Sequence, residues 1–242
     1  MKRSVIFFIF FVLVISLLTT QAENLAESNE LGDREIVVLL HGLARSNKAM
    51  WHLKQRLEEA GFYVEAVSYP SLNQTPQQII QNISQQIDEC CKLATNRVHF
   101  VGHSLAGLLI RAYLTENHPQ NLGRAVLIGT PNQGAEVADY VKDKWWAQFA
   151  GPAALSLGTS KDSFPKTIPE PDYPVGIIAG VTPSDNDHII PGLDDGLVSV
   201  ESTKLKNMHD FITIPSGHSM MRYNKSVATQ TIHFLKSGHF EK

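Results

Sequence analysis

Ser104 lies in the segment GHSLAG (102–107), between a short apolar run and a stretch with helical periodicity. A tight turn from strand to helix exposes a serine hydroxyl and strains its backbone, so a serine held there can act as a nucleophile. The usual pattern for such a turn is G-x-S-x-G, whereas here Ala106 takes the fifth position and Gly107 follows it. The turn also directs the amide of Leu105, at the start of the predicted helix, to where an oxyanion would form.

A serine hydroxyl is a poor nucleophile until a base removes its proton, and a carboxylate must hold that base in the right tautomer. Asp195, in the segment DDGLV (194–198), and His218, in the segment IPSGHS (214–219), each follow a predicted strand. The chain order Ser104, Asp195, His218 is the order found with nucleophiles on such strand-to-helix turns. We therefore predict that the three side chains meet at one edge of a sheet and carry out acyl transfer.

Other residues compete for these roles. Asp194, next to Asp195, is the alternative acid. The alternative histidines either precede the last predicted strand or lie in the last predicted helix: His188, His209 and His233. His103 is beside the nucleophile, and we expect it to pack or hydrogen-bond at the turn rather than act as a second base. His41 is expected to shape its own loop.

Strand patterns and helix patterns alternate along the chain. Continuous apolar or β-branched runs predict strands at 35–40, 62–67, 98–101, 124–128, 175–179 and 211–214. Apolar residues at helical spacing predict helices at 46–61, 75–91, 105–114 and 224–236, the first capped by Ser46 and Asn47. This alternation predicts an α/β fold, with a mostly parallel sheet that helices cover on both faces.

Residues 132–174 interrupt the alternation, and the rest of 35–242 is expected to form a single domain around the sheet. The interrupting segment contains Trp145, Trp146 and Phe149, the apolar run 151–155 and a proline-rich exit. Ligands in such folds bind beyond the carboxyl ends of the strands, so we expect this insertion to lie over the site as a lid or cap. Its composition fits a lid that opens on lipid and a cap packed on the sheet equally well.

Taken together, the motifs resemble those of the α/β-hydrolase superfamily, and within it the bacterial lipase and esterase branch. LLHGL (39–43) resembles the oxyanion segment of that branch, and IGTPNQGA (128–135) resembles the segment that leads into its lid. DDGLV and IPSGHS resemble its acid and histidine loops. The resemblance extends over about residues 35–236. It implies an α/β-hydrolase fold with a lid insertion, Asp195 as the catalytic acid, and the Leu43 amide as the second oxyanion donor.

We therefore expect a serine hydrolase that cleaves a small-molecule or lipid carboxylic ester through Ser104, His218 and Asp195, with an acyl-enzyme intermediate. The same triad could instead act on thioesters, or pass the acyl group to another acceptor as an acyltransferase. A non-catalytic binding protein on a hydrolase scaffold is the third alternative. No cofactor is expected. Contact with a membrane or lipid interface would be transient and made through 132–174.

The composition argues against other classes of protein. The chain has 242 residues, 43% of them hydrophobic and 19% charged, which suits one globular domain. Its net charge of -3 gives no basic excess for binding nucleic acid. Asp185, Asp187, His188 and Asp194 form an acidic segment, for which a metal site is the alternative interpretation. It lacks a calcium-loop pattern, and SMMR (219–222) lacks the acid that holds calcium in several bacterial lipases, so no metal is expected.

Residues 1–22 have the features of a signal peptide. Lys2 and Arg3 precede a run of mostly apolar residues at 5–18, and small residues follow it. An uncleaved anchor is the alternative, although a helix needs about 20 apolar residues to span a bilayer. We expect 23–34 to be a loose lead-in and the mature protein to be exported, to the periplasm or outside the cell.

The chain has only two cysteines, Cys90 and Cys91, and they are adjacent. The Cα separation across one peptide bond is shorter than disulfide geometry favours, so we expect two thiols. A vicinal or an intermolecular disulfide is the alternative in an oxidising compartment.

Overall fold

The computed structural model describes residues 34–92, 94–145, 150–183 and 189–242. Its centre is a six-stranded sheet in the order β2-β1-β3-β4-β5-β6, in which each pair of neighbouring strands is parallel. The predicted α/β fold with a parallel sheet is confirmed. The strands are β1 (Ile36–Leu40), β2 (Tyr63–Val67), β3 (Val98–His103), β4 (Leu122–Ile128), β5 (Val175–Val181) and β6 (Asp210–Pro215).

Burial explains why the inner strands form. Every residue of β1 and β3 is buried, and a strand covered on both faces needs apolar side chains at successive positions. The outer strands β2 and β6 are only partly buried. Because β1 pairs with both β2 and β3, the chain first builds toward one edge and then returns to build toward the other. This reversal leaves a crevice beyond the ends of β1 and β3, where α/β folds bind ligands.

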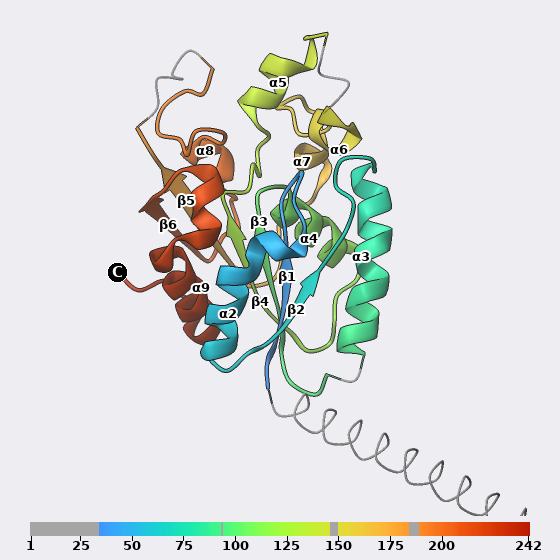
Figure 1. Ribbon diagram of the computed structural model, residues 1–242, viewed down its shortest axis with the longest axis vertical. Helices are drawn as coiled ribbons and strands as arrows, with labels where there is room; N and C mark the ends of the chain where they lie inside the picture. Colours follow the sequence, from blue (N-terminus) through green and yellow to red (C-terminus); the bar gives the residue numbers. More distant parts are fainter. Residues whose placement is uncertain (1–33, 93, 146–149, 184–188) are drawn as a thin grey trace, which may run out of the picture.

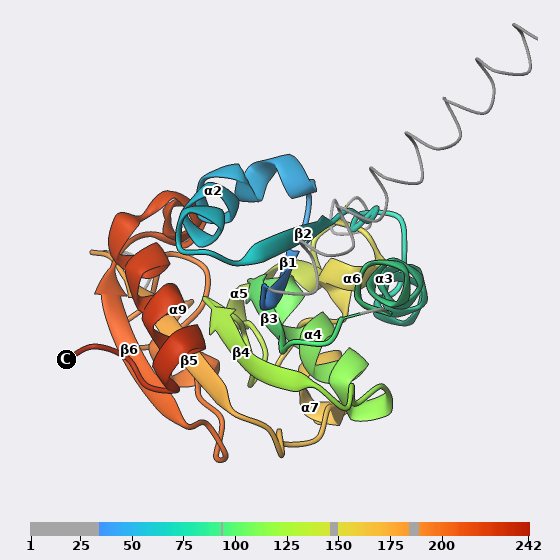
Figure 2. The ribbon, with the colours of Figure 1, turned by 90° about the horizontal axis from the view of Figure 1, so that it is seen from below.

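Helices cover both faces of the sheet (Figure 2). α2 (Trp51–Glu59) and α9 (Lys225–Ser237) pack on one face, and α3 (Pro76–Cys91) and α4 (Leu105–Glu116) pack on the other. Two apolar cores fill the space between these layers. The core beneath α3 and α4 includes Ile79, Ile83 and Leu108, and the core beneath α2 and α9 includes Leu53, Leu57 and Phe234.

Two helix starts differ in how they are capped. α3 begins with a capping box, in which Thr75 Oγ1 accepts from the Gln78 amide and Gln78 Oε1 accepts from the Thr75 amide. The predicted cap at Ser46 is wrong, because its side chain makes no capping hydrogen bond at the 3-10 helix η1 (Asn47–Met50). Asn47 instead donates from Nδ2 to the carbonyl of Ala66, which ties η1 to the end of β2.

The two cysteines lie at the last residues of α3. Cys90 and Cys91 are joined by a disulfide between neighbouring residues, so the expectation of two thiols is wrong. The bridge falls where the helix stops and its hydrogen-bond ladder no longer constrains the backbone on both sides.

The described part of 132–174 forms short helices at the carboxyl edge of the sheet: α5 (Glu136–Lys142), α6 (Pro152–Leu155) and α7 (Phe164–Thr167) (Figure 1). A buried polar network attaches this insertion to α4. Arg111 donates from Nη1 to Asn132 Oδ1 and from Nη2 to the carbonyls of Ile168 and Pro169, each at 3.1 Å. Asn132 in turn donates to the carbonyl of Thr203, at the end of α8 (Val200–Thr203).

Several sequence predictions concern residues outside the described ranges. These are the signal peptide at 1–22, nearly all of the lead-in, Trp146, Phe149, Asp185, Asp187 and His188. Among the described residues, no helix combines the length and the hydrophobicity of a membrane span. The same residues include no group of three or more His, Cys, Asp or Glu side chains arranged to hold a metal ion.

Candidate active site

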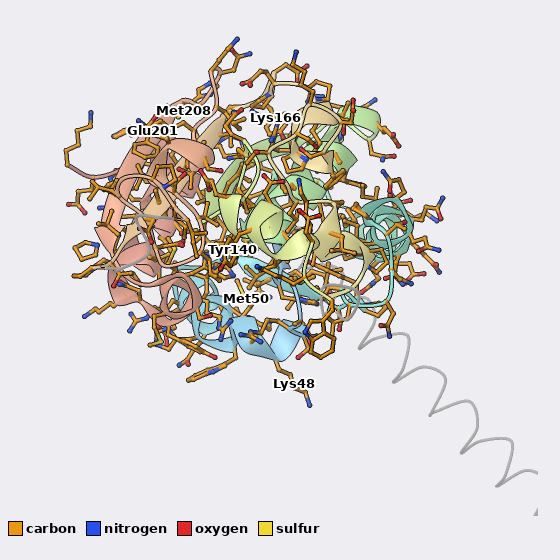
Figure 3. The ribbon with its side chains drawn as sticks, turned by 90° about the horizontal axis from the view of Figure 1, so that it is seen from above. Lys48, Met50, Tyr140, Lys166, Glu201 and Met208 are labelled. Carbon is orange, nitrogen blue, oxygen red and sulfur yellow. A yellow bond between two sulfur atoms is a disulfide. The ribbon has the colours of Figure 1, made fainter. Side chains whose placement is uncertain are left out.

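Ser104, Asp195 and His218 come together at the carboxyl edge of the sheet, the edge seen from above in Figure 3. Ser104 joins β3 to α4, Asp195 follows β5, and His218 begins the 3-10 helix η3 (His218–Tyr223) after β6. Ser104 Oγ lies 2.9 Å from His218 Nε2, and His218 Nδ1 lies 2.7 Å from Asp195 Oδ2. This hydrogen-bonded chain from hydroxyl through imidazole to carboxylate is the arrangement that activates a serine.

The backbone of Ser104 is strained. Its φ of 61° and ψ of -126° lie where residues with side chains are rarely found. The Ser104 amide donates to the carbonyl of Ile128 at 2.8 Å, which fixes the turn against β4. A strained residue between a buried strand and a buried helix is held in one position, so the hydroxyl is directed at the histidine before any substrate arrives.

Glycines around the turn let strand and helix approach. A Cβ at Gly102 would lie 2.7 Å from Ile110 Cδ1, and a Cβ at Gly107 would overlap the side chain of Thr130. Ala106, in the fifth position of the motif, is fully buried. The contact that requires glycine therefore falls one residue later than the usual pattern places it, which accounts for the sequence GHSLAG.

The two neighbouring aspartates point to different partners. Asp195 Oδ1 accepts from the amides of Leu197 and Val198, at 3.0 and 2.8 Å, while its Oδ2 faces the histidine. Asp194 Oδ1 accepts from the amide of Gly196 at 2.6 Å, within its own turn. The amide of His218 also donates to the carbonyl of Asp195 at 2.7 Å, so the acid and histidine loops are joined through backbone as well as side chains.

His103 supports the histidine loop from the opposite side. Its Nε2 donates to the carbonyl of His218 at 2.9 Å, and the two ring centroids are 4.8 Å apart. Burial, followed by electrostatic repulsion between its protonated form and the neighbouring imidazole of His218, lowers the pKa of His103 to about 3. His103 is therefore neutral near pH 7 and serves as a hydrogen-bond donor at the turn.

Three other histidines of the described ranges have partners or positions away from the serine hydroxyl. His41 is buried, stacks on Tyr69 with centroids 4.0 Å apart, and donates from Nδ1 to the Gly42 carbonyl. Burial lowers the pKa of His41, so it stays neutral and shapes its loop. His209 lies before β6 and accepts from the Val175 amide at the opposite edge of the sheet, and His233 lies on α9.

The predicted oxyanion donors are the amides of Leu43 and Leu105. Leu105 is the first residue of α4, and Leu43 follows Gly42, where a Cβ would lie 3.2 Å from Ser104 Cβ. The loop is fixed by Ala44, whose φ is 54° and whose amide donates to Ser71 Oγ. Within the described ranges, neither the Leu43 nor the Leu105 amide has a protein acceptor. Both donors are thus available to a ligand oxygen beside Ser104.

A cavity of about 290 Å³ opens beside the serine. This is near the lower limit of the range of roughly 300–1,000 Å³ typical of small-molecule sites. Most of its lining is apolar and comes from the insertion and the acid loop: Ala135, Val137, Ala138, Val141, Ala150, Ala154, Leu157, Leu197 and Val198. Arg45 and Arg222 also line it, and neither is among the predicted site residues. Their closeness in sequence to Leu43 and His218 is the signal that would have found them.

Comparison with known proteins gives one family and several partial relatives. A family model described as palmitoyl protein thioesterase matches residues 36–165, more than half of the chain. Triacylglycerol lipases of Pseudarthrobacter phenanthrenivorans and Burkholderia plantarii are each 30% identical over 119 residues. These matches cover 44% of this chain and 36% and 32% of the two lipases. The chain therefore spans about a third of the length of these relatives.

Solved structures share the fold over most of the chain. A lipase of Bacillus licheniformis in its mature form superposes with a TM-score of 0.66 and 16% identity, covering 83% of this chain and 89% of that one. Phospholipase PlaB of Legionella pneumophila gives a TM-score of 0.65 and 15% identity, covering 85% of this chain and 60% of that one. At such identities the likeness concerns the fold.

Proposed function

Because the chain belongs to the palmitoyl protein thioesterase family, within the α/β-hydrolase superfamily, we propose that it hydrolyses acyl esters through an acyl-enzyme on Ser104. The observation that carries the proposal is the line of hydrogen bonds from Ser104 Oγ through His218 to Asp195, at 2.9 and 2.7 Å. The free amides of Leu43 and Leu105 beside that hydroxyl support it. Lipase-, esterase- and thioesterase-type hydrolases share this superfamily, and the substrate is part of the proposal.

In the first half of the reaction, Ser104 Oγ attacks the carbonyl carbon of the ester. His218 Nε2 takes the hydroxyl proton, and Asp195 stabilises the imidazolium through Nδ1–H. The carbonyl oxygen becomes an oxyanion and accepts from the amides of Leu43 and Leu105. The intermediate then collapses, His218 gives its proton to the leaving alcohol, and the acyl group stays on Ser104.

In the second half, water takes the place of the alcohol. His218 removes a proton from the water, whose oxygen attacks the acyl carbon, and the same two amides hold the second oxyanion. Collapse releases the carboxylic acid and returns the proton to Ser104 Oγ. His103 stays neutral in both halves because its pKa is about 3, so a single base serves the cycle.

A thioester is the second candidate substrate, because the matching family is described as palmitoyl protein thioesterase. The same residues would act, with a thiol in place of the alcohol as leaving group. The two candidate substrates are distinguished by measuring hydrolysis of an octanoyl oxyester and an octanoyl thioester of matched structure. A kcat/KM that is higher for the thioester by ten-fold or more would identify a thioesterase, and the reverse would identify an esterase.

The experiment that tests the proposal is hydrolysis of p-nitrophenyl esters from two to sixteen carbons, with Ser104→Ala as the blank. We expect turnover that depends on Ser104. A maximum at eight carbons or longer would support acyl binding under 132–174. A maximum at two to four carbons would mean a small closed pocket and a short-chain esterase. Turnover that survives Ser104→Ala would remove Ser104 as the nucleophile.

The proposal extends to where the enzyme acts. Export follows from the signal-peptide features of 1–22, and amino-terminal sequencing of the secreted or periplasmic protein tests it. Contact with a lipid interface is supported by exposed apolar side chains of the insertion, with Tyr140 51%, Trp145 81% and Leu155 43% exposed. Co-sedimentation with phosphatidylcholine vesicles should fall in Tyr140→Ser and Trp145→Ser. Co-sedimentation of both variants at the wild-type level would instead indicate that the insertion is a closed cap.

A further inference from the structure

Two arginine side chains line the cavity beside Ser104. Arg45 follows the oxyanion segment two residues after Leu43, and Arg222 lies in η3, which begins with His218. η3 packs against η1, the helix that follows Arg45, so the two cations come from adjacent elements. In the view onto this edge, Lys48 of η1 lies on one side, with Tyr140 of α5 toward the middle (Figure 3). The cavity therefore has a cationic part from the catalytic loops and an apolar part from the insertion.

Among the described residues, no carboxylate pairs with either guanidinium. The residues that line the cavity include no Asp or Glu, and within the described ranges neither guanidinium forms an ion pair. Arg45 donates to the carbonyl of its neighbour Ala44 at 3.0 Å. Arg222 lies over the ring of Tyr223, and its Nε is buried without a hydrogen-bond partner in the described structure. The two guanidinium groups therefore act toward a ligand as charges that line the cavity, and the buried Nε adds no contact to it.

Both charges act at the site itself. After burial and repulsion from the imidazole of His218, the charges of Arg222 and Arg45 further lower the pKa of His103, the residue beside the nucleophile. A guanidinium stays charged at any physiological pH, and it binds phosphate or carboxylate through two parallel hydrogen bonds. A single arginine can neutralise a carboxylate and donate hydrogen bonds to both of its oxygens. A phosphate monoester carries close to two negative charges and three acceptor oxygens, so it suits two.

We propose that the leaving group of the natural substrate carries a phosphate, which Arg45 and Arg222 bind while the acyl chain occupies the apolar part of the cavity. This inference rests on the proposed function and adds to it the chemical class of the leaving group. A glycerophosphate ester carries such a phosphate close to the acyl carbonyl, whereas a phosphopantetheine thioester carries it at the far end of a longer chain.

The test compares two substrate pairs that differ only in the phosphate. The first is 1-octanoylglycerol 3-phosphate against 1-octanoylglycerol, and the second is S-octanoyl phosphopantetheine against S-octanoyl pantetheine. The ratio of kcat/KM, phosphorylated over unphosphorylated, is measured for wild type, Arg45→Gln, Arg222→Gln and the double variant. Lys48→Gln is the matched control, because Lys48 is an exposed cation of η1 that does not line the cavity.

We expect a ratio well above one in at least one pair, and that pair identifies the source of the phosphate. Arg222→Gln should lower the ratio about ten-fold, and the more exposed Arg45→Gln by less, because solvent and salt screen an exposed charge. Lys48→Gln should leave it unchanged. Equal ratios in wild type and double variant, for both pairs, would overturn the inference. Ser104-dependent hydrolysis of the unphosphorylated esters would then leave the proposed function standing.

A binding measurement covers the case in which none of these esters turns over. Calorimetry with octyl phosphate on Ser104→Ala should give a Kd that rises about ten-fold or more when Arg45 and Arg222 are both changed to Gln. The same Kd with and without the arginines would overturn the inference independently of any activity.

Discussion

His103 Nε2 lies 2.9 Å from the backbone carbonyl oxygen of His218, so the residue next to Ser104 also holds the loop that carries His218. The contact is a second link between Ser104 and His218, made by the side chain of His103 and the backbone carbonyl of His218 and separate from the Ser104–His218 side-chain hydrogen bond. A misplacement of about 1 Å can cost a factor of a hundred in rate. In the proposed reaction, the precision of the Ser104–His218 hydrogen bond would therefore depend in part on His103, a residue that takes no proton.

Replacing His103 should lower the rate without lowering affinity. In His103→Leu the donor to the His218 carbonyl is lost, and we expect kcat to fall about ten- to a hundred-fold with KM little changed. His103→Gln keeps an N–H donor of similar reach and should recover much of the rate. Steady-state kinetics on one p-nitrophenyl ester checks both variants. If Leu and Gln behave alike, the hydrogen bond has no part in positioning.

His103 should also make stability depend on pH. Its pKa is about 3 in the folded chain and about 6.5 when unfolded, so between these values the unfolded state binds the extra proton. The free energy of unfolding contributed by this group is complete above pH 6.5 and declines as pH falls toward 3, by up to about 1.4 kcal/mol per unit. Urea unfolding of wild type and His103→Gln from pH 4 to 7 measures it. Parallel curves for the two proteins would refute this assignment.

The neighbouring aspartates should differ sharply in their effect. Asp195→Asn removes the carboxylate that orients His218, and we expect kcat to fall about ten-thousand-fold. Asp194→Asn keeps an oxygen that can accept from the Gly196 amide, so its kcat should stay within a few-fold of wild type. Kinetic assays of the two variants under identical conditions decide the point. A larger loss in Asp194→Asn would exchange their roles.

Arg111 should matter for stability more than for chemistry. It is buried and donates to Asn132, Ile168 and Pro169, so Arg111→Met would leave those buried acceptors without their donor. We expect a loss of about 3 kcal/mol in the free energy of unfolding. Arg97→Met, at an exposed position, is the control and should change it by less than about 0.5 kcal/mol. Equal losses in the two variants would mean that the network contributes nothing.

Ala106 and Gly107 should differ in how much stability is lost when each is exchanged for the other residue type. Gly107→Ala places a Cβ on the side chain of Thr130 and should cost about 3 kcal/mol of stability, because overpacking a tight contact shifts backbone. Ala106→Gly restores the usual G-x-S-x-G pattern and should cost only about 1 kcal/mol, the helix propensity difference. Thermal unfolding of both variants is the measurement. A tolerated Gly107→Ala would show that Thr130 can move away.

Much of the fold follows from local pattern. β1 is a continuous apolar run because helices cover both faces of the sheet, and β3, though it contains two histidines, is buried throughout. α3 repeats apolar residues at helical spacing because one of its faces packs on the sheet. The segments that carry Ser104, Asp195 and His218 could be found because each follows a strand, and parallel strands end at one edge. Their meeting is a consequence of topology, which the alternation of elements already indicates.

Other features depend on contacts between distant residues and have no local pattern. Arg111 is a helix residue like any other until the insertion folds back and supplies Asn132 and the carbonyls near Ile168. The predicted cap at Ser46 is wrong, and Asn47 instead hydrogen-bonds to a residue of β2. Sequence spacing does not show this contact between distant residues. Arg45 and Arg222 are far apart in the chain, and only the packing of η1 on η3 brings them to one cavity.

The central claim is that Ser104 is a nucleophile activated by His218 and Asp195. Reaction with a fluorophosphonate, followed by intact-mass and peptide mass spectrometry, tests it most directly because the probe needs an activated serine and no knowledge of the substrate. We predict one adduct per chain, located on Ser104, absent in Ser104→Ala and formed far more slowly in His218→Ala. An adduct on another residue, or no adduct on the folded wild-type protein, would contradict the account.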